Sequence, residues 1–317
     1  MPADQGPTVG AAVDLGSNSV HLLVAAVAAH RLQVIADESV FLGLGDAVGE
    51  RGFLGRAGRG ELAATLVRYA DSARRLGATN VTFLGTEPIR RAADAAAIVH
   101  DVASSSGTPL YVVTHEEEAF LTLIGVTEGM PVVHETLVVD VGGGSSEFCV
   151  VDAGRPARAA GLRLGSATLT RRFVASDPPT PDEVGAMRSA ASAAVADAPD
   201  ARPSEIVAVG GTASNLVKVI RFGRSRRVLT RDGTAKGLAL LAAEPAELAA
   251  LRNAIKPARA RILPAGAVIV DAILRRYGVD SMRVSEAGIR EGAILARAHA
   301  GTAWRDRLPD LAHGWRA

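Results

Sequence analysis

The sequence predicts an α/β protein of two domains, and three observations lead to this prediction. The chain has 317 residues, which is more than one hydrophobic core usually serves. Short apolar runs typical of strands alternate with longer amphipathic runs typical of helices. One pattern occurs twice, at residues 13–19 and 139–146: a strand that ends in Asp and is followed by a Gly/Ser turn. The large separation of the two copies suggests that they open two related domains.

The predicted elements alternate along the whole chain. In the first half, we expect strands at residues 20–27, 32–36, 81–84 and 110–113, and helices at 60–76, 92–104 and from 114. In the second half, we expect strands at residues 136–140, 147–151, 206–209 and 282–285, and helices at 181–196, 213–220, 246–251, 265–277 and from 289. Each Asp loop is predicted to join a hairpin, because β-prone residues lie on both sides of its Gly/Ser turn.

Composition and charge exclude several classes of protein. No apolar run reaches the ~18 residues needed to cross a bilayer. Asp4 stands where a signal peptide would carry positive charge. Cys149 is the single cysteine, so disulfides within the chain are excluded and a reducing cytoplasm is expected. Because the formal net charge is +1, local groups must hold any anionic substrate, and we expect neither a nucleic acid nor a membrane as a partner.

Three turns have the composition of phosphate-binding loops. Two belong to the repeated pattern, and the third, Gly210-Gly211-Thr212, follows the strand at 206–209. Glycine lets backbone N–H groups approach an oxyanion, and Ser and Thr hydroxyls add donors. Packing alone is a poor explanation for three such loops, so we predict that they bind phosphate.

Six motifs occur in order along nearly the whole chain. They are the loop at 13–19, Thr86-Glu87-Pro88-Ile89-Arg90, Glu116-Glu117-Glu118-Ala119, the loop at 140–147, Gly210-Gly211-Thr212-Ala213 and the run at 284–292. Together they resemble the exopolyphosphatase and guanosine pentaphosphate phosphohydrolase (Ppx/GppA) family, whereas any one glycine-rich loop would be a weak signal. The resemblance implies two ribonuclease-H-like domains of the actin-like ATPase and sugar kinase superfamily, with the active site in the cleft between them.

The resemblance also guides the expected domain boundaries. We expect the first domain at residues 1–121, with a C-terminal helix at 297–317 packing back on it, and the second at 122–296. One loop departs from the family pattern. After Leu164-Gly165 the family shows Arg-Leu-Thr-Glu, whereas this chain has Thr168-Leu169-Thr170-Arg171, which puts substrate contacts from that loop in question.

Three carboxylates are candidates for binding a metal ion. Asp14, Asp140 and Glu147 come from the two Asp loops, and converging carboxylates cannot all stay ionised without a cation between them. Oxygen ligands of this kind suit Mg²⁺ or Mn²⁺. The alternative is that the two aspartates only cap turns, as Asp often does.

Glu118 is the candidate general base. Thr114 and Glu117 have the spacing of a capping box, which leaves Glu118 free at the edge of an apolar stripe where desolvation could raise its pKa. By pattern alone, acids in a first helical turn more often complement the helix dipole. The resemblance favours a base, because the Glu directly before Ala119, 22 positions ahead of Asp140, matches the family's catalytic base.

Arg90 is predicted to bind a phosphate oxygen, because its planar guanidinium suits a tetrahedral oxyanion. The remaining predicted phosphate-binding residues are Ser17, Asn18, Ser19, Gly143, Gly144, Ser145, Ser146, Gly211 and Thr212. For Ser145 and Ser146, the alternative is that they are strand-edge hydroxyls. The histidines show no His-x-x-x-His spacing and are interpreted as surface or satisfied residues.

These inferences predict a metal-dependent hydrolase that releases terminal orthophosphate from inorganic polyphosphate, with Glu118 activating the attacking water and a homodimer as the expected assembly. A first alternative is hydrolysis of guanosine pentaphosphate, which presents the same terminal phosphoanhydride. The second is an ATP-dependent kinase or ATPase, and the third is an inactive binding protein. The basic run at 218–231 is interpreted either as a track for distal phosphates or as a solvated turn.

Overall fold

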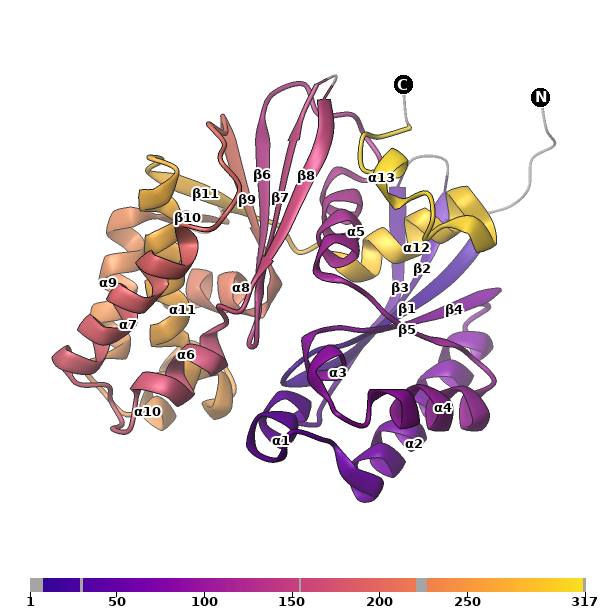
Figure 1. The fold of residues 1–317 in the computed structure, drawn as a ribbon, viewed down its shortest axis with the longest axis horizontal. Helices are drawn as coiled ribbons and strands as arrows, with labels where there is room; N and C mark the ends of the chain where they lie inside the picture. Colours follow the sequence, from indigo (N-terminus) through magenta and orange to yellow (C-terminus); the bar gives the residue numbers. More distant parts are fainter. Residues whose placement is uncertain (1–7, 29–30, 154, 221–226, 316–317) are drawn as a thin grey trace. The chain divides into compact units, whose positions relative to one another are not determined.

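The computed structural model describes residues 8–28, 31–153, 155–220 and 227–315. They form two compact units, each with a mixed sheet and helices, which confirms the predicted two-domain α/β class (Figure 1). Unit 1 extends to Pro131 and resumes at Ala287, and unit 2 is Val132–Glu286. The boundaries expected from the sequence, after residues 121 and 296, would instead fall inside helices α5 (His115–Thr127) and α12 (Ile289–Ala300).

Unit 1 contains a five-stranded sheet in the order β3-β2-β1-β4-β5. The strands are β1 (Thr8–Leu15), β2 (Ser19–Ala28), β3 (Arg31–Phe41), β4 (Asn80–Gly85) and β5 (Leu110–Val112). The first three form antiparallel hairpins, and β4 and β5 run parallel to β1. Strands β1 and β2 are buried along most of their length because helices cover both faces of the sheet.

The helices of unit 1 lie in two layers, one on each face of the sheet (Figure 1). They are α1 (Leu44–Arg51), α2 (Gly55–Arg75), α3 (Glu87–Arg91), α4 (Ala95–Ser106), α5, α12, the short 3₁₀ helix η1 (Gly301–Ala303) and α13 (Leu308–Leu311). Leu62 of α2 and Ile98 of α4 share a core with Val13 of β1. On the other face, a Cβ at Gly10 would lie 3.1 Å from a side-chain carbon of Ile294 in α12.

Helices α5 and α12 approach each other unusually closely. A Cβ added at Gly292 of α12 would lie 1.8 Å from the carbonyl oxygen of Leu121, and one at Gly125 of α5 would lie 2.0 Å from that of Gly288. Only glycine permits this backbone contact. The two glycines therefore fix how α5 sits on α12.

Unit 2 repeats the strand arrangement of unit 1 and adds one strand at the edge. Its six-stranded sheet has the order β10-β11-β9-β6-β7-β8. The strands are β6 (Thr136–Val141), β7 (Ser146–Asp152), β8 (Arg155–Leu162), β9 (Glu205–Val209), β10 (Val228–Thr230) and β11 (Ser281–Val284). As in unit 1, two antiparallel hairpins are followed by two strands parallel to the first.

The helices of unit 2 surround one long helix, α11 (Pro257–Arg276), whose middle is buried. They are α6 (Ser166–Phe173), α7 (Pro181–Val195), α8 (Gly210–Ile220), α9 (Arg231–Leu241), α10 (Ala246–Asn253) and α11 itself. Helix α11 begins eight residues before the predicted start at 265, because Pro264 lies inside the helix instead of preceding it. Among the described residues, no helix is long and apolar enough to span a bilayer.

Candidate functional site

The predicted Asp loops have the same turn in both units. In unit 1 the amide of Gly16 donates to the carbonyl of Ser19 at 3.2 Å, and in unit 2 the amide of Gly142 donates to that of Ser145 at 3.0 Å. Each turn follows a strand whose penultimate residue is an aspartate. The repeat found in the sequence is therefore a repeat of three-dimensional structure, with Asp14 and Asp140 at equivalent places.

In unit 1, main-chain and side-chain contacts of Ser17 and Asn18 hold the first loop. The Ser17 hydroxyl donates to Glu87 at 3.1 Å, and the Ser17 carbonyl accepts from Gly45 at 2.7 Å. The carbonyl of Asn18 accepts from the amides of the two residues that precede α1, at 3.1 and 3.0 Å. These contacts rigidify the loop beside Asp14.

Asp14 is a buried carboxylate in a positively charged environment. Its Oδ1 atom is buried and has no hydrogen-bond partner among the residues that the structure describes. Burial raises the pKa of Asp14 to about 6, although Arg290, Arg90 and the Thr86 hydroxyl each act to lower it. A buried, unpartnered carboxylate oxygen is the kind of atom that a cation would satisfy.

Arg90 contacts the predicted base directly. Its Nη1 atom donates to Glu118 Oε2 at 2.6 Å and to the Val113 carbonyl at 2.8 Å, and its Nη2 atom lies 2.9 Å from His115 Nδ1. Glu118 is buried, with 7% of its surface exposed. Sequence reasoning set His115 aside, and the only signal that could have singled it out is its place three residues before Glu118 on a helix.

The start of α5 has the predicted capping box. Glu117 donates its amide to the Thr114 hydroxyl at 3.1 Å, and the Glu117 carboxylate accepts from the Thr114 amide at 2.7 Å. The cap leaves the neighbouring Glu118 side chain to meet Arg90. The predicted capping box is therefore confirmed.

In unit 2, Asp140 and Glu147 face each other across the hairpin. They are paired residues on β6 and β7, and Glu147 is 2% exposed. Like charges directly opposite in a sheet are destabilising unless a proton or cation offsets them. Gly210, the first residue of α8, lies close to Asp140: a Cβ at this position would lie 2.4 Å from Asp140 Oδ1. The φ angle of Gly210, +87°, also favours glycine.

The glycine loop of unit 2 is held by the start of α6. The amides of Ser166 and Ala167 donate to the carbonyls of Gly142 and Gly143 at 3.0 and 2.9 Å, and the Thr168 hydroxyl donates to Gly144 at 3.2 Å. Thr168 is one of the two residues, with Arg171, at which the chain departs from the family pattern. Here it supports the loop that carries the predicted phosphate-binding glycines.

The hydroxyls of the remaining predicted residues are mostly engaged within unit 2. Ser146 donates to the Leu164 carbonyl at 2.5 Å, which matches the alternative of a strand-edge hydroxyl. Thr212 lies 3.4 Å from the Ser166 hydroxyl and is 4% exposed. Gly211 lies in the first turn of α8, which begins at Gly210 and not after Thr212 as predicted.

Arg259 is a charged residue that sequence reasoning missed. It lies near the start of α11, and a Cβ at Gly211 would be 3.1 Å from its Nη1 atom. Its guanidinium has no hydrogen-bond or ion-pair partner within the described part of the chain, and burial lowers its pKa. No signal in the sequence singled out this residue, because the predicted helix began at residue 265, after Arg259.

Comparisons with known proteins agree with this geometry. A solved structure of a Ppx/GppA family member from Aquifex aeolicus matches with a TM-score of 0.82 and 26% identity, covering 94% of this chain and 99% of that one. The model of the Ppx/GppA phosphatase family matches residues 23–300. The chain belongs to the Ppx/GppA phosphatase family. The predicted family resemblance is confirmed.

Curated relatives of this Ppx/GppA phosphatase carry exopolyphosphatase names. Exopolyphosphatase 1 of Mycobacterium tuberculosis is 28% identical over 305 residues, covering 90% of this chain and 87% of that protein. A putative exopolyphosphatase of Haemophilus influenzae is 25% identical over 296 residues, covering 90% of both. The family and these names indicate an exopolyphosphatase-type hydrolase.

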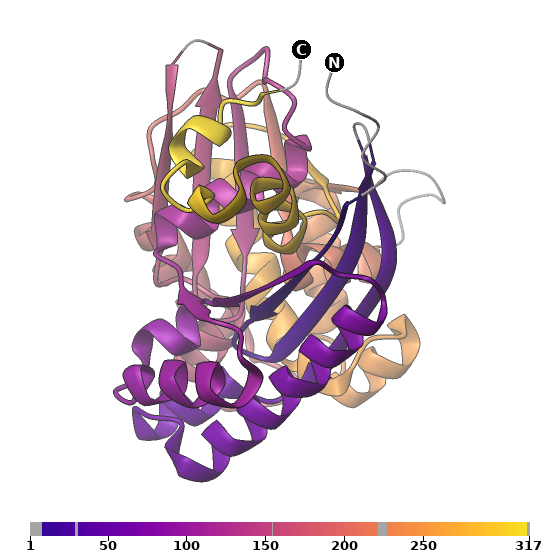
Figure 2. The same ribbon diagram turned by 90° about the vertical axis from the view of Figure 1, so that its right-hand side faces the viewer.

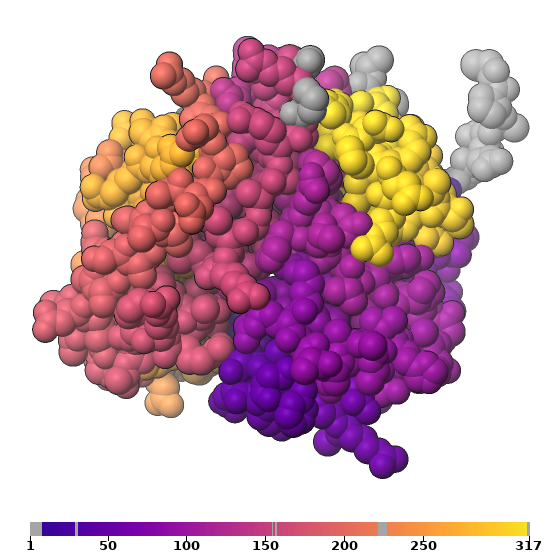
Figure 3. All heavy atoms as spheres, in the orientation of Figure 1, coloured from indigo at the N-terminus to yellow at the C-terminus, as the bar shows by residue number. Residues whose placement is uncertain are grey.

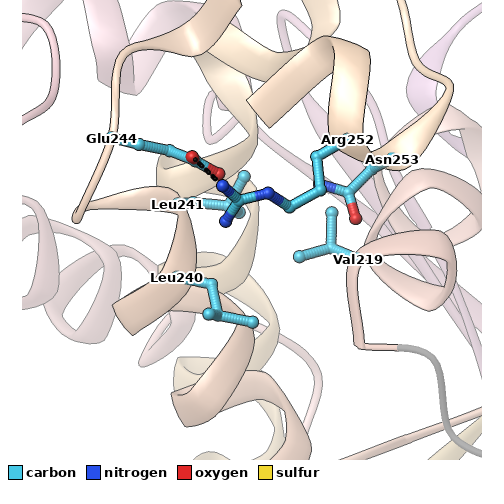
Figure 4. A pocket seen from close by; sticks show the side chains of 6 residues that line it. All are labelled: Val219, Leu240, Leu241, Glu244, Arg252 and Asn253. Atoms are coloured by element: carbon cyan, nitrogen blue, oxygen red, sulfur yellow. Dashed lines mark ion pairs between the residues drawn. The ribbon is translucent and has the colours of Figure 1, made fainter. Parts of the chain in front are cut away.

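Two further features of this Ppx/GppA phosphatase lie away from the predicted residues. A cavity of about 190 Å³ in unit 2 lies between α8, α9 and α10 (Figure 4). It is lined by Val219, Leu240, Leu241, Glu244, Arg252 and Asn253, none of them a predicted site residue, and Arg252 pairs with Glu244 at 3.0 Å. Within the basic run, residues 221–226 lie outside the described residues, and Arg227 forms an ion pair with Glu286.

Proposed function

We propose that this phosphatase releases terminal orthophosphate from inorganic polyphosphate, with Glu118 as the base that activates water. The names of the relatives support the substrate. The observation that carries the proposal is the 2.6 Å contact between Arg90 and the buried Glu118. A guanidinium and a carboxylate in contact offer the two groups that phosphoanhydride hydrolysis needs, an anion ligand and a proton acceptor.

The proposed step is a direct displacement by water. The water oxygen bonds to the terminal phosphorus while its proton passes to Glu118, and the bond from that phosphorus to the bridging oxygen breaks. The products are orthophosphate and a chain shorter by one phosphate, which keeps the bridging oxygen and its negative charge. In the free protein Arg90 is bound to Glu118, and a terminal phosphate would compete with Glu118 for the Arg90 guanidinium.

Arg259 is proposed as a second anion ligand. An uncompensated guanidinium that is partly buried is costly to keep, and the cost disappears when an anion binds. Its position beside Gly211 places it at one of the three loops predicted to bind phosphate. Its planar fork can contact two oxygens of a phosphate at once.

Asp14, Asp140 and Glu147 are proposed as ligands of Mg²⁺ or Mn²⁺. The fit rests on the buried Oδ1 of Asp14, which has no partner among the described residues, and on the direct opposition of the other two carboxylates across their hairpin. Oxygen donors suit these cations. When bound, the ion would neutralise charge on the transferred phosphoryl group.

The test measures phosphate release by the purified protein from short polyphosphate, long polyphosphate, guanosine pentaphosphate and ATP, each with Mg²⁺, with Mn²⁺ and with chelator. We expect release from short and long polyphosphate, and loss of release with chelator. Activity confined to guanosine pentaphosphate would assign the other reaction of the family, and activity confined to ATP would indicate an ATPase. No release from any substrate would contradict the proposal. The proposal also includes a cytoplasmic homodimer, and light scattering of the purified protein tests the dimer.

A further inference from the structure

The segment at residues 301–315 packs against α5 and contacts both of its ends. Figure 1 shows α13 beside α5, Figure 2 shows the same C-terminal region in yellow from the side, and Figure 3 shows it at the surface of unit 1. At the start of α5, Arg305 binds Glu117. Beyond its end, the Trp315 amide donates to the Gly129 carbonyl at 3.0 Å. This segment is therefore in a position to control how α5 is held.

Arg305 binds both the start of α5 and the strand that precedes it. Its Nε and Nη2 atoms donate to the two carboxylate oxygens of Glu117 at 2.5 and 2.9 Å, and Nη2 also donates to the Val112 carbonyl at 2.9 Å. Burial raises the pKa of Glu117, but hydrogen bonds from Arg305 and the Thr114 amide outweigh it, so the pKa is lowered and Glu117 stays ionised.

Arg305 and Arg90 hold consecutive residues in the same way. Arg305 binds the carbonyl of Val112 and the carboxylate of Glu117. Arg90 binds the carbonyl of Val113 and the carboxylate of Glu118, each one residue further along the chain than the group that Arg305 binds. Any rotation of the first turn of α5 that breaks one pair of contacts also displaces the other, because adjacent residues of a helix move together.

The main chain around Arg305 is anchored independently of Glu117. Trp304 is 1% exposed and packs edge-on against Tyr111, with ring centroids 5.4 Å apart and an interplanar angle of 84°. The Arg305 guanidinium is thus presented from a fixed point. A preorganised partner of this kind can orient a side chain with little additional loss of entropy.

We propose that Arg305 is a positioning residue for the reaction: by holding Glu117 and Val112 it sets the first turn of α5, and thereby the orientation of Glu118 toward Arg90. This inference rests on the proposed role of Glu118. Nothing in it requires Arg305 to touch the substrate. The alternative is that Arg305 only ties the segment to the fold, and a partly exposed ion pair of this kind contributes little to stability.

The test compares Arg305→Gln with Arg305→Lys and with the matched control Arg307→Gln. Arg307 is in the same segment, and among the described residues its side chain forms a 3.8 Å ion pair with Asp310 and none with α5. Misorienting a reacting group by a fraction of an ångström to about 1 Å costs roughly tenfold to a hundredfold in rate. We expect Arg305→Gln to lower kcat by about tenfold or more with little change in KM. Arg305→Lys should recover part of the rate, and Arg307→Gln should match the wild type.

Amide hydrogen exchange of residues 113–118 in the resting protein provides a readout that does not depend on the reaction. We expect faster exchange there in Arg305→Gln and unchanged exchange in Arg307→Gln. Unchanged kcat and unchanged exchange in Arg305→Gln would overturn the inference. Glu118→Gln is assayed alongside: if it remains active, the proposed base is wrong, and the exchange data still decide whether Arg305 orders the start of α5.

Discussion

Arg90 donates a 2.6 Å hydrogen bond to Glu118, so the residue predicted to bind phosphate and the residue predicted to accept a proton are partners in the structure. The two lie 28 positions apart in the sequence, on α3 and α5. The contact gives the buried glutamate an ion-pair partner in the free protein. It also means that neither residue can be replaced without affecting the other.

Glu118→Gln should lower turnover by about 10² or more, because the amide keeps the shape of the side chain but cannot accept the proton. Binding should persist. The measurement is kcat for phosphate release together with a binding titration of polyphosphate to the variant. Near-normal turnover of the purified variant would show that another group accepts the proton.

Arg259→Gln should weaken polyphosphate binding and leave the protein at least as stable as the wild type. Removing one charged contact to a phosphate costs about 1.5 to 3 kcal/mol, so KM should rise about tenfold or more. Stability should not fall, because no described residue pairs with this guanidinium and its burial is unfavourable.

The control for Arg259 is Lys256→Gln, which removes an exposed charge at the N-cap of the same helix. KM from initial rates and urea unfolding are measured on both variants. An Arg259→Gln protein with unchanged KM would exclude Arg259 from substrate binding. A protein that lost both affinity and stability would indicate a structural role instead.

Asp140→Asn should raise the metal concentration that gives half-maximal activity, by about tenfold or more, because a neutral amide is a poorer ligand for a hard cation. The measurement is a titration of Mg²⁺ and of Mn²⁺ into chelator-treated protein. Gly210, which approaches Asp140 Oδ1, should tolerate the near-isosteric replacement. An unchanged metal requirement would mean that Asp140 is not a ligand.

Local patterns in the sequence were sufficient to predict much of the fold and parts of the site. The capping box at Thr114 and Glu117 and the two Asp turns depend on residues within a few positions of one another, and all three form as predicted. Helix starts were less predictable. Proline usually ends a helix, yet Pro264 lies within α11.

Contacts between distant residues were beyond sequence reasoning. Arg259 meets Gly211 only because α11 packs against α8, and that packing depends on the whole core of unit 2. His115 meets Arg90 through the pairing of β4 with β5, which brings α3 to the start of α5. Neither relationship leaves a periodicity or a spacing in the sequence.

Asp14→Asn should stabilise the metal-free protein at pH 8 and abolish or strongly reduce its activity. Burial raises the pKa of Asp14 to about 6, from 3.8 in the unfolded chain, so the ionised side chain destabilises the fold above pH 6. As the pH falls from 6 toward 4, the folded protein takes up the proton first and the penalty disappears. Asparagine has no charge to bury, so the variant should be more stable by up to about 3 kcal/mol at pH 8 and by much less at pH 4. Urea unfolding of both proteins in chelator at the two pH values measures this difference.

Adding Mg²⁺ or Mn²⁺ should then raise the unfolding midpoint of the wild type more than that of the variant, if Asp14 is a ligand. An equal response of the two proteins to metal would remove Asp14 from the ligand set, and a stability difference independent of pH would show that its charge is not what the fold opposes.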